Sequence, residues 1–255
     1  MSSFGEFVAA HHRAGALVVQ PRMGMSDPAT MRSGLLATKR AAATTVGTIT
    51  LDSYTRVGDL AAAQAALGAG ADLNGYPITS HDVTTTRAML DGIAGPDFPV
   101  QVRHGSATPD HIVATLVRAG LHATEGGPVS YCLPYSRGPL ATSVDSWARC
   151  CEHLAGLRDT GTEAHLESFG GCLMGQLCPP GLLVAVSVLE GMFFRQHGLA
   201  SISLSYAQQT HPGQDEEAVL ALRRLAAEFL SDVDCHVVVY TYMGVYPKTP
   251  GGATA

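Results

Sequence analysis

The chain has 255 residues, a formal net charge of −6 and 46% hydrophobic residues. This length suits one large α/β domain with a substantial core, and the mild acidity argues against nucleic acid or an anionic membrane as the main partner. No apolar run reaches the roughly 18 residues of a membrane span. The N-terminus also lacks the charged and apolar regions of a signal peptide, so we expect a cytoplasmic protein.

Strand-like and helix-like segments alternate along the chain, which favours βαβ units and a parallel sheet. Strands are expected near residues 16–20, 45–51, 71–74, 99–103, 121–124, 163–167, 201–205 and 235–240. Helical periodicity predicts helices over 59–68, 109–120, 179–198 and 215–230. Eight such units in a single domain over residues 1–255 predict a TIM-type (β/α)8 barrel, with a doubly wound sheet as the alternative.

The segment after the last expected strand, residues 241–255, is rich in glycine and proline. It has no helical pattern that could cover the outer face of that strand. We therefore expect a barrel that is truncated at its C-terminus and completed by a longer polypeptide or by a partner.

No motif in the sequence indicates metal or nucleotide chemistry. The chain has no P-loop, nucleophile elbow or zinc-binding helix, and its histidines lack ligand-like spacing. The six cysteines form no CxxC pair and are interpreted mainly as small buried hydrophobes. We therefore predict no metal site in this chain.

Three expected strands each end in an arginine, namely Arg22, Arg56 and Arg103. Active sites of parallel α/β folds lie at the carboxyl ends of the strands. Because a guanidinium binds a carboxylate through two parallel hydrogen bonds, three of them at one edge would suit a substrate with more than one carboxylate. Three unrelated surface or salt-bridge arginines are the alternative.

The segment 125–137 (EGGPVSYCLPYSR) combines glycine with aromatic residues directly after an expected strand. Tyr131 and Tyr135 are four residues apart, and tyrosine hydroxyls donate to carboxylates. Glu125 can accept an ammonium group. Beside the three arginines, this loop would complete a site for an amino dicarboxylate, whereas the alternative is a structural loop with core tyrosines.

Six stretches resemble the large catalytic (epsilon) subunit of glutamate mutase, also called methylaspartate mutase. They are QPRMG at 20–24, TITLDSYTR at 48–56, LNGYP at 73–77, QVRHG at 101–105, TEGGPVSYCLPY at 124–135 and YMGVYP at 242–247. The matches run in order across nearly the whole chain. The resemblance implies a TIM barrel that catalyses the reversible rearrangement of L-glutamate to L-threo-3-methylaspartate.

The resemblance also assigns roles to individual positions of this chain. It implies substrate-binding roles for Arg22, Arg56, Arg103, His104, Glu125, Tyr131 and Tyr135, with the arginines on the carboxylates and Glu125 near the ammonium. It implies that Gly24, Asn74, Pro134 and Tyr246 lie against adenosylcobalamin. The family's later part brings a Lys and a Glu to the adenosyl ribose, and this sequence has no counterpart to either.

The implied cofactor, adenosylcobalamin, supplies radical chemistry, and a separate small cobalamin-binding subunit supplies the cobalt ligand. The implied assembly is a heterotetramer of two large and two small subunits. The competing hypothesis is an incomplete or non-catalytic barrel that still binds an amino dicarboxylate or a partner subunit.

Overall fold

A single parallel sheet of six strands forms the centre of the computed structural model, which describes residues 3–134, 136–173 and 178–241. The strands follow chain order, each pairing in parallel with the next. They are β1 (Gly47–Thr50), β2 (Val100–Arg103), β3 (Ala123–Gly126), β4 (His165–Ser168), β5 (Ser201–Ala207) and β6 (Asp234–Tyr240). This order without reversal is that of a TIM-type barrel and not of a doubly wound sheet. In the described part of the chain the barrel is open between β6 and β1.

The edge of the sheet beyond β1 is irregular. The strand expected at 16–20 is reduced to one parallel bridge between Val19 and Thr45. The strand expected at 71–74 is wrong, because pairing occurs only at Tyr76, which bridges Leu51. A Cβ on Gly75 would lie 2.5 Å from the Leu51 carbonyl carbon, so the backbone crosses the edge too closely for a regular strand.

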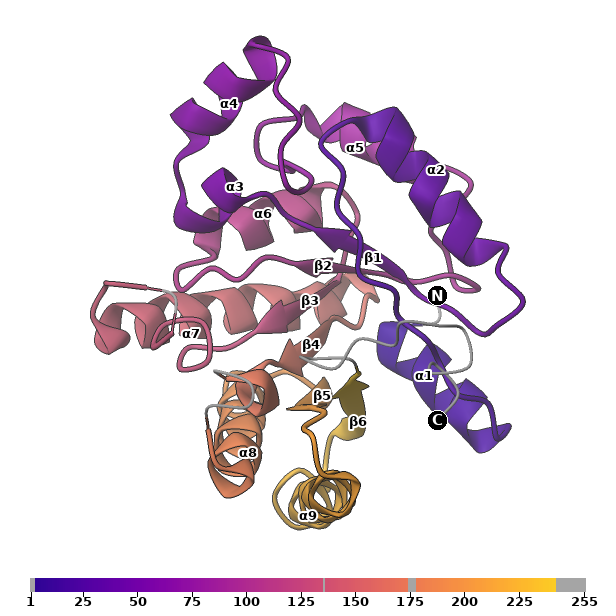
Figure 1. Cartoon of the computed structure of the whole chain (residues 1–255), viewed down its shortest axis with the longest axis vertical. Coiled ribbons are helices and arrows are strands. Elements are labelled where there is room, and N and C mark those ends of the chain that lie inside the picture. The colour runs from indigo at the N-terminus through magenta and orange to yellow at the C-terminus, as the bar shows by residue number, and fades with distance from the viewer. Residues whose placement is uncertain (1–2, 135, 174–177, 242–255) are drawn as a thin grey trace.

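Helices cover the convex side of the curved sheet (Figure 1). They are α2 (Pro28–Lys39), α3 (Ser53–Val57), α4 (Leu60–Gly68), α5 (Val83–Leu90), α6 (Asp110–Arg118), α7 (Leu140–Gly156), α8 (Pro180–Gln196) and α9 (Pro212–Phe229), with short 3₁₀ turns η1 (Leu157–Thr160) and η2 (Gly170–Cys172). The last helix begins three residues before its expected start, because the His211 side chain accepts from the Gln214 N–H and Pro212 occupies the first turn. Every helix of the described ranges is too short or too polar to cross a bilayer.

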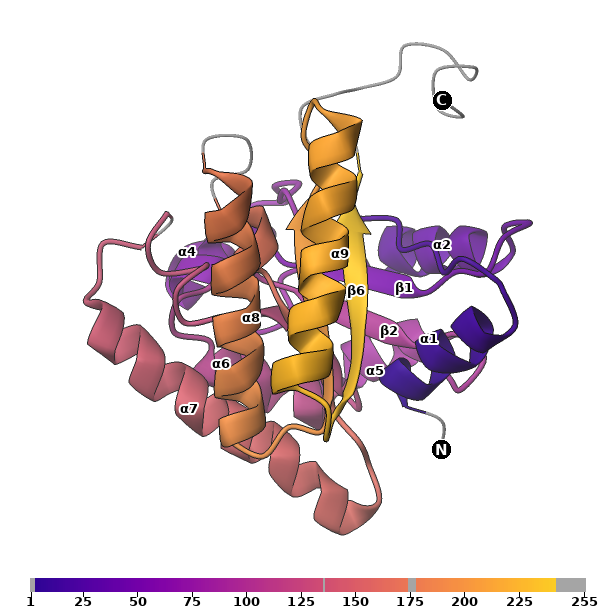
Figure 2. The same cartoon turned by 90° about the horizontal axis from the view of Figure 1, so that it is seen from below.

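Helix α1 (Phe4–Arg13) lies apart from the others, on the concave side of the sheet and near β6 (Figures 1 and 2). Its Phe4 ring stacks on His165 at 4.9 Å between centroids. A Cβ on Gly5 would lie 2.1 Å from the Ser201 hydroxyl, so the helix fits closely against β5. This helix fills the amino-terminal end of the concave side and leaves the carboxyl end for a site. The expectation of a missing C-terminal helix concerns residues 241–255, of which 242–255 lie outside the described residues.

Candidate functional site

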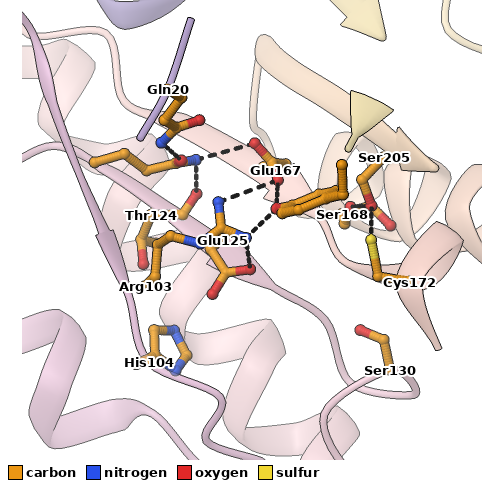
Figure 3. A network of polar contacts seen from close by, with 12 residues as sticks. Gln20, Arg103, His104, Thr124, Glu125, Ser130, Glu167, Ser168, Cys172 and Ser205 are labelled. Carbon is orange, nitrogen blue, oxygen red and sulfur yellow. Dashed lines mark hydrogen bonds and ion pairs between the residues drawn. The ribbon is translucent and has the colours of Figure 1, made fainter. Parts of the chain in front are cut away.

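Four buried polar side chains meet at the carboxyl ends of the strands, on the concave side (Figure 3). Arg103 is the last residue of β2 and is 2% exposed, and Glu125 lies in β3 and is 1% exposed. Glu167 from β4 is fully buried, and Tyr240 ends β6. Glu125 pairs with Glu167 in the parallel register, and Arg103 and Glu125 each follow the paired residues Val102 and Thr124. Tyr240 pairs with Ala207, nearer the carboxyl end, and its hydroxyl reaches Glu167 although the two are far apart in the chain.

The Arg103 guanidinium is held by both carboxylates. Its Nη2 donates to Glu125 at 3.1 Å, and its Nη1 lies 3.7 Å from Glu167. Nη2 also donates to the Tyr240 hydroxyl, which in turn donates to Glu167, and the guanidinium carbon lies 4.6 Å from the centre of that tyrosine ring. Nε is buried and has no hydrogen-bond partner among the described residues.

The buried network contains more formal negative than positive charge. Burial raises the pKa of Glu167 against the opposing effect of Arg103. Burial by itself lowers the pKa of Arg103. The nearby negative charges, of which Glu125 has the largest effect, outweigh burial and raise this pKa well above the ordinary value. One guanidinium between two carboxylates leaves a site that favours an additional cation.

Tyr131 lies over this network and is itself buried. Its hydroxyl donates to Glu125, and burial together with that carboxylate raises its pKa well above the ordinary value. Its ring packs against Phe169 at 5.0 Å and against His104 at 5.5 Å. Tyr131 is therefore part of the buried network, and its hydroxyl is held in place.

Gly126, directly after Glu125, allows this packing. Gly126 has φ of 141°, a conformation that L residues rarely adopt. A Cβ there would lie 2.5 Å from the Trp147 ring and 2.6 Å from the Tyr131 ring. The rings can therefore close over the strand end only because no side chain is present at this position.

His104 follows Arg103 and is buried against the Trp147 ring, with 5.6 Å between centroids. Its Nδ1 accepts the Ser106 N–H at 3.0 Å, which leaves the proton on Nε2. Nε2 has no partner in the described part of the chain. Burial, and then the charge of Arg56, lowers the pKa of His104 to about 3, so this residue is a neutral donor.

Replacing His104 with asparagine should flatten the dependence of stability on pH between 6.5 and 5. The unfolded imidazole binds a proton near pH 6.5 and the folded one near pH 3, so the unfolded state holds more protons in between and stability is lost as the pH falls. His104 alone should contribute a loss of about 1.6 kcal/mol over this interval. Urea titrations of wild type and His104→Asn measure it, with exposed His153→Asn as the control. Parallel pH profiles for His104→Asn and wild type would contradict the buried neutral state.

The two remaining arginines lie closer to solvent than Arg103. Arg56 is half-buried in α3, where its Nε donates to the Leu51 carbonyl at 2.8 Å. A Cβ on Gly105 would lie 3.6 Å from its side chain, so Arg56 lies next to the loop after β2. Arg22 is exposed, and its charge reaches Tyr131, whose pKa it lowers slightly against the larger effect of burial. Arg56 and Arg22 thus lie near the carboxyl ends, while Arg103 is engaged by protein carboxylates.

The expected cofactor-contacting positions lie partly at the same edge. Gly24 packs on the end of β1, since a Cβ there would lie 2.2 Å from the Thr50 carbonyl oxygen. The exposed Asn74 accepts the N–H of Ser53, the first residue of α3, at 2.9 Å. Pro134 is half-buried in the loop after β3. Tyr135 and Tyr246 lie outside the described residues.

Three members of the network were not among the residues expected from the sequence, namely Glu167, Tyr240 and Gln101. Gln101 donates to the Thr124 carbonyl at 3.1 Å and to Glu167 at 3.4 Å. The signal that indicated the arginines, a polar residue at the end of an apolar strand, is also present at Glu167 and Tyr240. Among the described residues, no group of three or more His, Cys, Asp or Glu side chains could hold a metal ion.

Comparison with known proteins places the chain among relatives of one kind. The family model described as methylaspartate mutase E chain matches residues 1–255. The glutamate mutase epsilon subunit of Haloarcula marismortui is 35% identical over 222 residues, covering 81% of this chain and 45% of that protein. The subunit of the same name from Halobacterium salinarum is 32% identical over 251 residues, covering 95% of this chain and 52% of that protein.

A solved structure, 2,3-dimethylmalate lyase of the PEP mutase/isocitrate lyase superfamily, superposes with a TM-score of 0.39 at 14% identity. The superposition covers 89% of the present chain and 76% of the lyase chain. A likeness this distant adds nothing to the fold, which follows from the strand order itself. The chain spans about half the length of the curated relatives that it matches.

Proposed function

This chain belongs to the methylaspartate mutase E chain family, and on that premise we propose that it forms the substrate-binding part of an adenosylcobalamin-dependent isomerase. The proposed reaction interconverts L-glutamate and L-threo-3-methylaspartate. The observation that carries the proposal is the buried cluster of Arg103, Glu125 and Tyr131 at the carboxyl ends of β2 and β3. It supplies groups for an ammonium and a carboxylate side by side.

The substrate ammonium is proposed to bind Glu125, because the buried network carries one guanidinium between two carboxylates and favours a further cation. The free Nε–H of Arg103 and the Nε2–H of His104 are buried donors without described partners. A substrate carboxylate would satisfy both, which removes the penalty of burying unpaired polar groups.

Arg56 and Arg22 are proposed to hold the second carboxylate. Their lesser burial leaves the guanidinium groups accessible from the carboxyl end of the sheet. Each such charge-assisted contact contributes on the order of 1.5–3 kcal/mol. Fixed guanidinium groups at both ends of the substrate would keep the carboxylates in place while the carbon skeleton rearranges.

Adenosylcobalamin would supply the radical that removes hydrogen from the substrate. Two of the described residues would lie beside such a group at the carboxyl end of β1: Gly24 packs directly on the Thr50 backbone, and Asn74 has an exposed amide. With Pro134 in the loop after β3, these residues would line the cofactor and keep water from the site. The cobalt ligand is proposed to come from a small cobalamin-binding subunit, in a heterotetramer of two large and two small subunits.

The test is reconstitution of this chain with the small subunit and adenosylcobalamin, followed by measurement of 3-methylaspartate formed from L-glutamate. Formation that depends on both additions supports the proposal. Binding of L-glutamate or of the small subunit without turnover would favour the alternative, a non-catalytic barrel that binds an amino dicarboxylate or a partner. If the chain shows no binding and no turnover, both the proposed isomerase and the alternative are contradicted.

The chain alone should not retain cobalamin on gel filtration. The reason is that the cobalt ligand is proposed to lie on the other subunit. We expect the protein peak to be colourless with adenosylcobalamin and to absorb in the visible range after the small subunit is added. Stoichiometric cobalamin on the isolated chain would contradict the division between two subunits.

A further inference from the structure

We propose that Glu190, on the outer helix α8, is a positioning residue that acts through Tyr131 by holding the loop after β3. The inference rests on the proposed function only for the identity of the substrate that Tyr131 and Glu125 would bind. The contact of Glu190 with the loop is independent of it.

The Glu190 carboxylate is 1% exposed and accepts four hydrogen bonds. Its Oε1 accepts the backbone N–H groups of Val129 at 3.1 Å and Ser130 at 2.8 Å. Its Oε2 accepts the hydroxyls of Ser130 at 3.0 Å and Ser168 at 2.9 Å. One side chain thus joins the loop after β3 to the end of β4.

The loop lies directly on this carboxylate. A Cβ on Gly127 would lie 2.1 Å from the Glu190 carboxylate, so only glycine permits the observed approach. Two consecutive N–H groups converging on one oxygen set the orientation of the backbone at Val129 and Ser130. The conformation of the loop is therefore determined by Glu190 and not by the strand alone.

The next residue in the chain after Ser130 is Tyr131. Its hydroxyl reaches Glu125, and its ring lies 6.4 Å from Trp147. Ser168, the other partner of Glu190, follows Glu167 in β4. A change at Glu190 would therefore displace Tyr131 first, and the network around Arg103 through it.

The environment of Glu190 shows which substitution preserves its role. Burial raises its pKa to about 7, so the protonated and charged forms coexist near neutrality. A proton fits on Oε2, where the hydroxyls of Ser130 and Ser168 can turn to accept it, while Oε1 faces only N–H donors. A glutamine can therefore keep Oε1 as the acceptor and donate from its amide nitrogen to the two hydroxyls.

The experiment compares Glu190→Leu, Glu190→Gln and Tyr131→Phe in the chain reconstituted with the small subunit and adenosylcobalamin. Ser187→Ala is the matched control, because Ser187 is buried on the same helix but exchanges hydrogen bonds with Ser205 of β5. A second measurement uses the chain without cofactor: Trp147 is its sole tryptophan, so intrinsic fluorescence reports on the surroundings of Tyr131.

Glu190→Leu should raise KM for L-glutamate about 10-fold or more and leave kcat within roughly 3-fold of wild type. The displaced Tyr131 would lose its hydrogen bond to the charged Glu125, the proposed partner of the substrate ammonium, and substrate binding would weaken. Glu190→Gln should stay within about 2-fold of wild type in both constants. In the Tyr131→Phe background, Glu190→Leu should add little, since its effect passes through the missing hydroxyl. Trp147 emission should shift in Glu190→Leu and not in Glu190→Gln or Ser187→Ala.

Two outcomes would overturn the proposal in favour of a general structural role. One is that Glu190→Leu and Tyr131→Phe have additive effects on KM. The other is that Trp147 emission shifts equally in Glu190→Leu and Ser187→Ala. If Glu190→Leu does not fold, Glu190→Asp takes its place in the experiment. Its shorter side chain withdraws the carboxylate from the loop, and the same results are expected. If wild type lacks turnover, the proposed function fails, and the fluorescence comparison still decides whether Glu190 positions the loop.

Discussion

Arg103→Met should abolish turnover and lower the free energy of unfolding by about 3–5 kcal/mol. The guanidinium is the cation that compensates the buried carboxylates of Glu125 and Glu167. Methionine fills the volume but leaves two carboxylates facing each other in the interior, so at least one must be protonated or the network must rearrange. We expect kcat/KM to fall at least roughly 10³-fold, since the proposed substrate contact and the orientation of Glu125 are lost together.

Urea unfolding and the reconstituted assay measure the two effects of Arg103→Met. Adding Glu167→Gln removes one of the uncompensated charges, so the double variant should regain part of the stability but none of the turnover. Arg149→Met is the control, because its ion pair with Asp110 is largely exposed and should contribute less than about 1 kcal/mol. Unchanged stability and kinetics in Arg103→Met would show that the network does not depend on its cation.

Gly126→Ala should disrupt the candidate site more severely than most single-methyl additions. The new Cβ would meet the Trp147 and Tyr131 rings at 2.5 and 2.6 Å, and alanine would be strained at φ of 141°. Overpacking costs about 1–3 kcal/mol and backbone strain another 1–3 kcal/mol or so. We expect a total loss of roughly 2–6 kcal/mol of stability and a shift of Trp147 fluorescence as the rings separate.

The matched control for this variant is Gly161→Ala. Gly161 also has a positive φ, of 79°, but a Cβ there meets nothing within 4 Å, so alanine should cost only the backbone strain. Thermal unfolding of both variants separates strain from steric overlap. Equal losses in Gly126→Ala and Gly161→Ala would contradict the packing of the rings against the strand end.

The candidate site is thus organised in two layers. Arg103, Glu125 and Tyr131 form the inner layer, where every described group except the Arg103 Nε is hydrogen-bonded or ion-paired. Arg56 and Arg22 lie toward solvent. A substrate with a charged group at each end would contact both layers, and this is consistent with the amino dicarboxylates proposed above.

Much of the fold could be predicted from local patterns. Runs of β-branched residues that pack on both faces, such as 45–51 and 99–103, predicted β1 and β2, and both are confirmed. The expected strand at 71–74 is wrong because its few apolar residues carried no information about Gly75, whose close approach to Leu51 is a tertiary contact. Arg103 and Glu125 were predicted to meet because the carboxyl ends of parallel strands share one edge.

The sequence by itself determined the alternation of strands and helices and placed Arg103 and Glu125 at strand ends, since these depend on periodicity and on short connections between neighbouring elements. The strand order, which separates a TIM-type barrel from a doubly wound sheet, came from the tertiary structure. Only the tertiary structure decided that Arg103 is enclosed by Glu167 and by Tyr240, which lies 137 residues further along the chain. It alone brought Glu190 from the middle of α8 to the loop after β3, 60 residues earlier. Burial and ion pairing depend on which distant segments fill the same space, and no local pattern of residues records that.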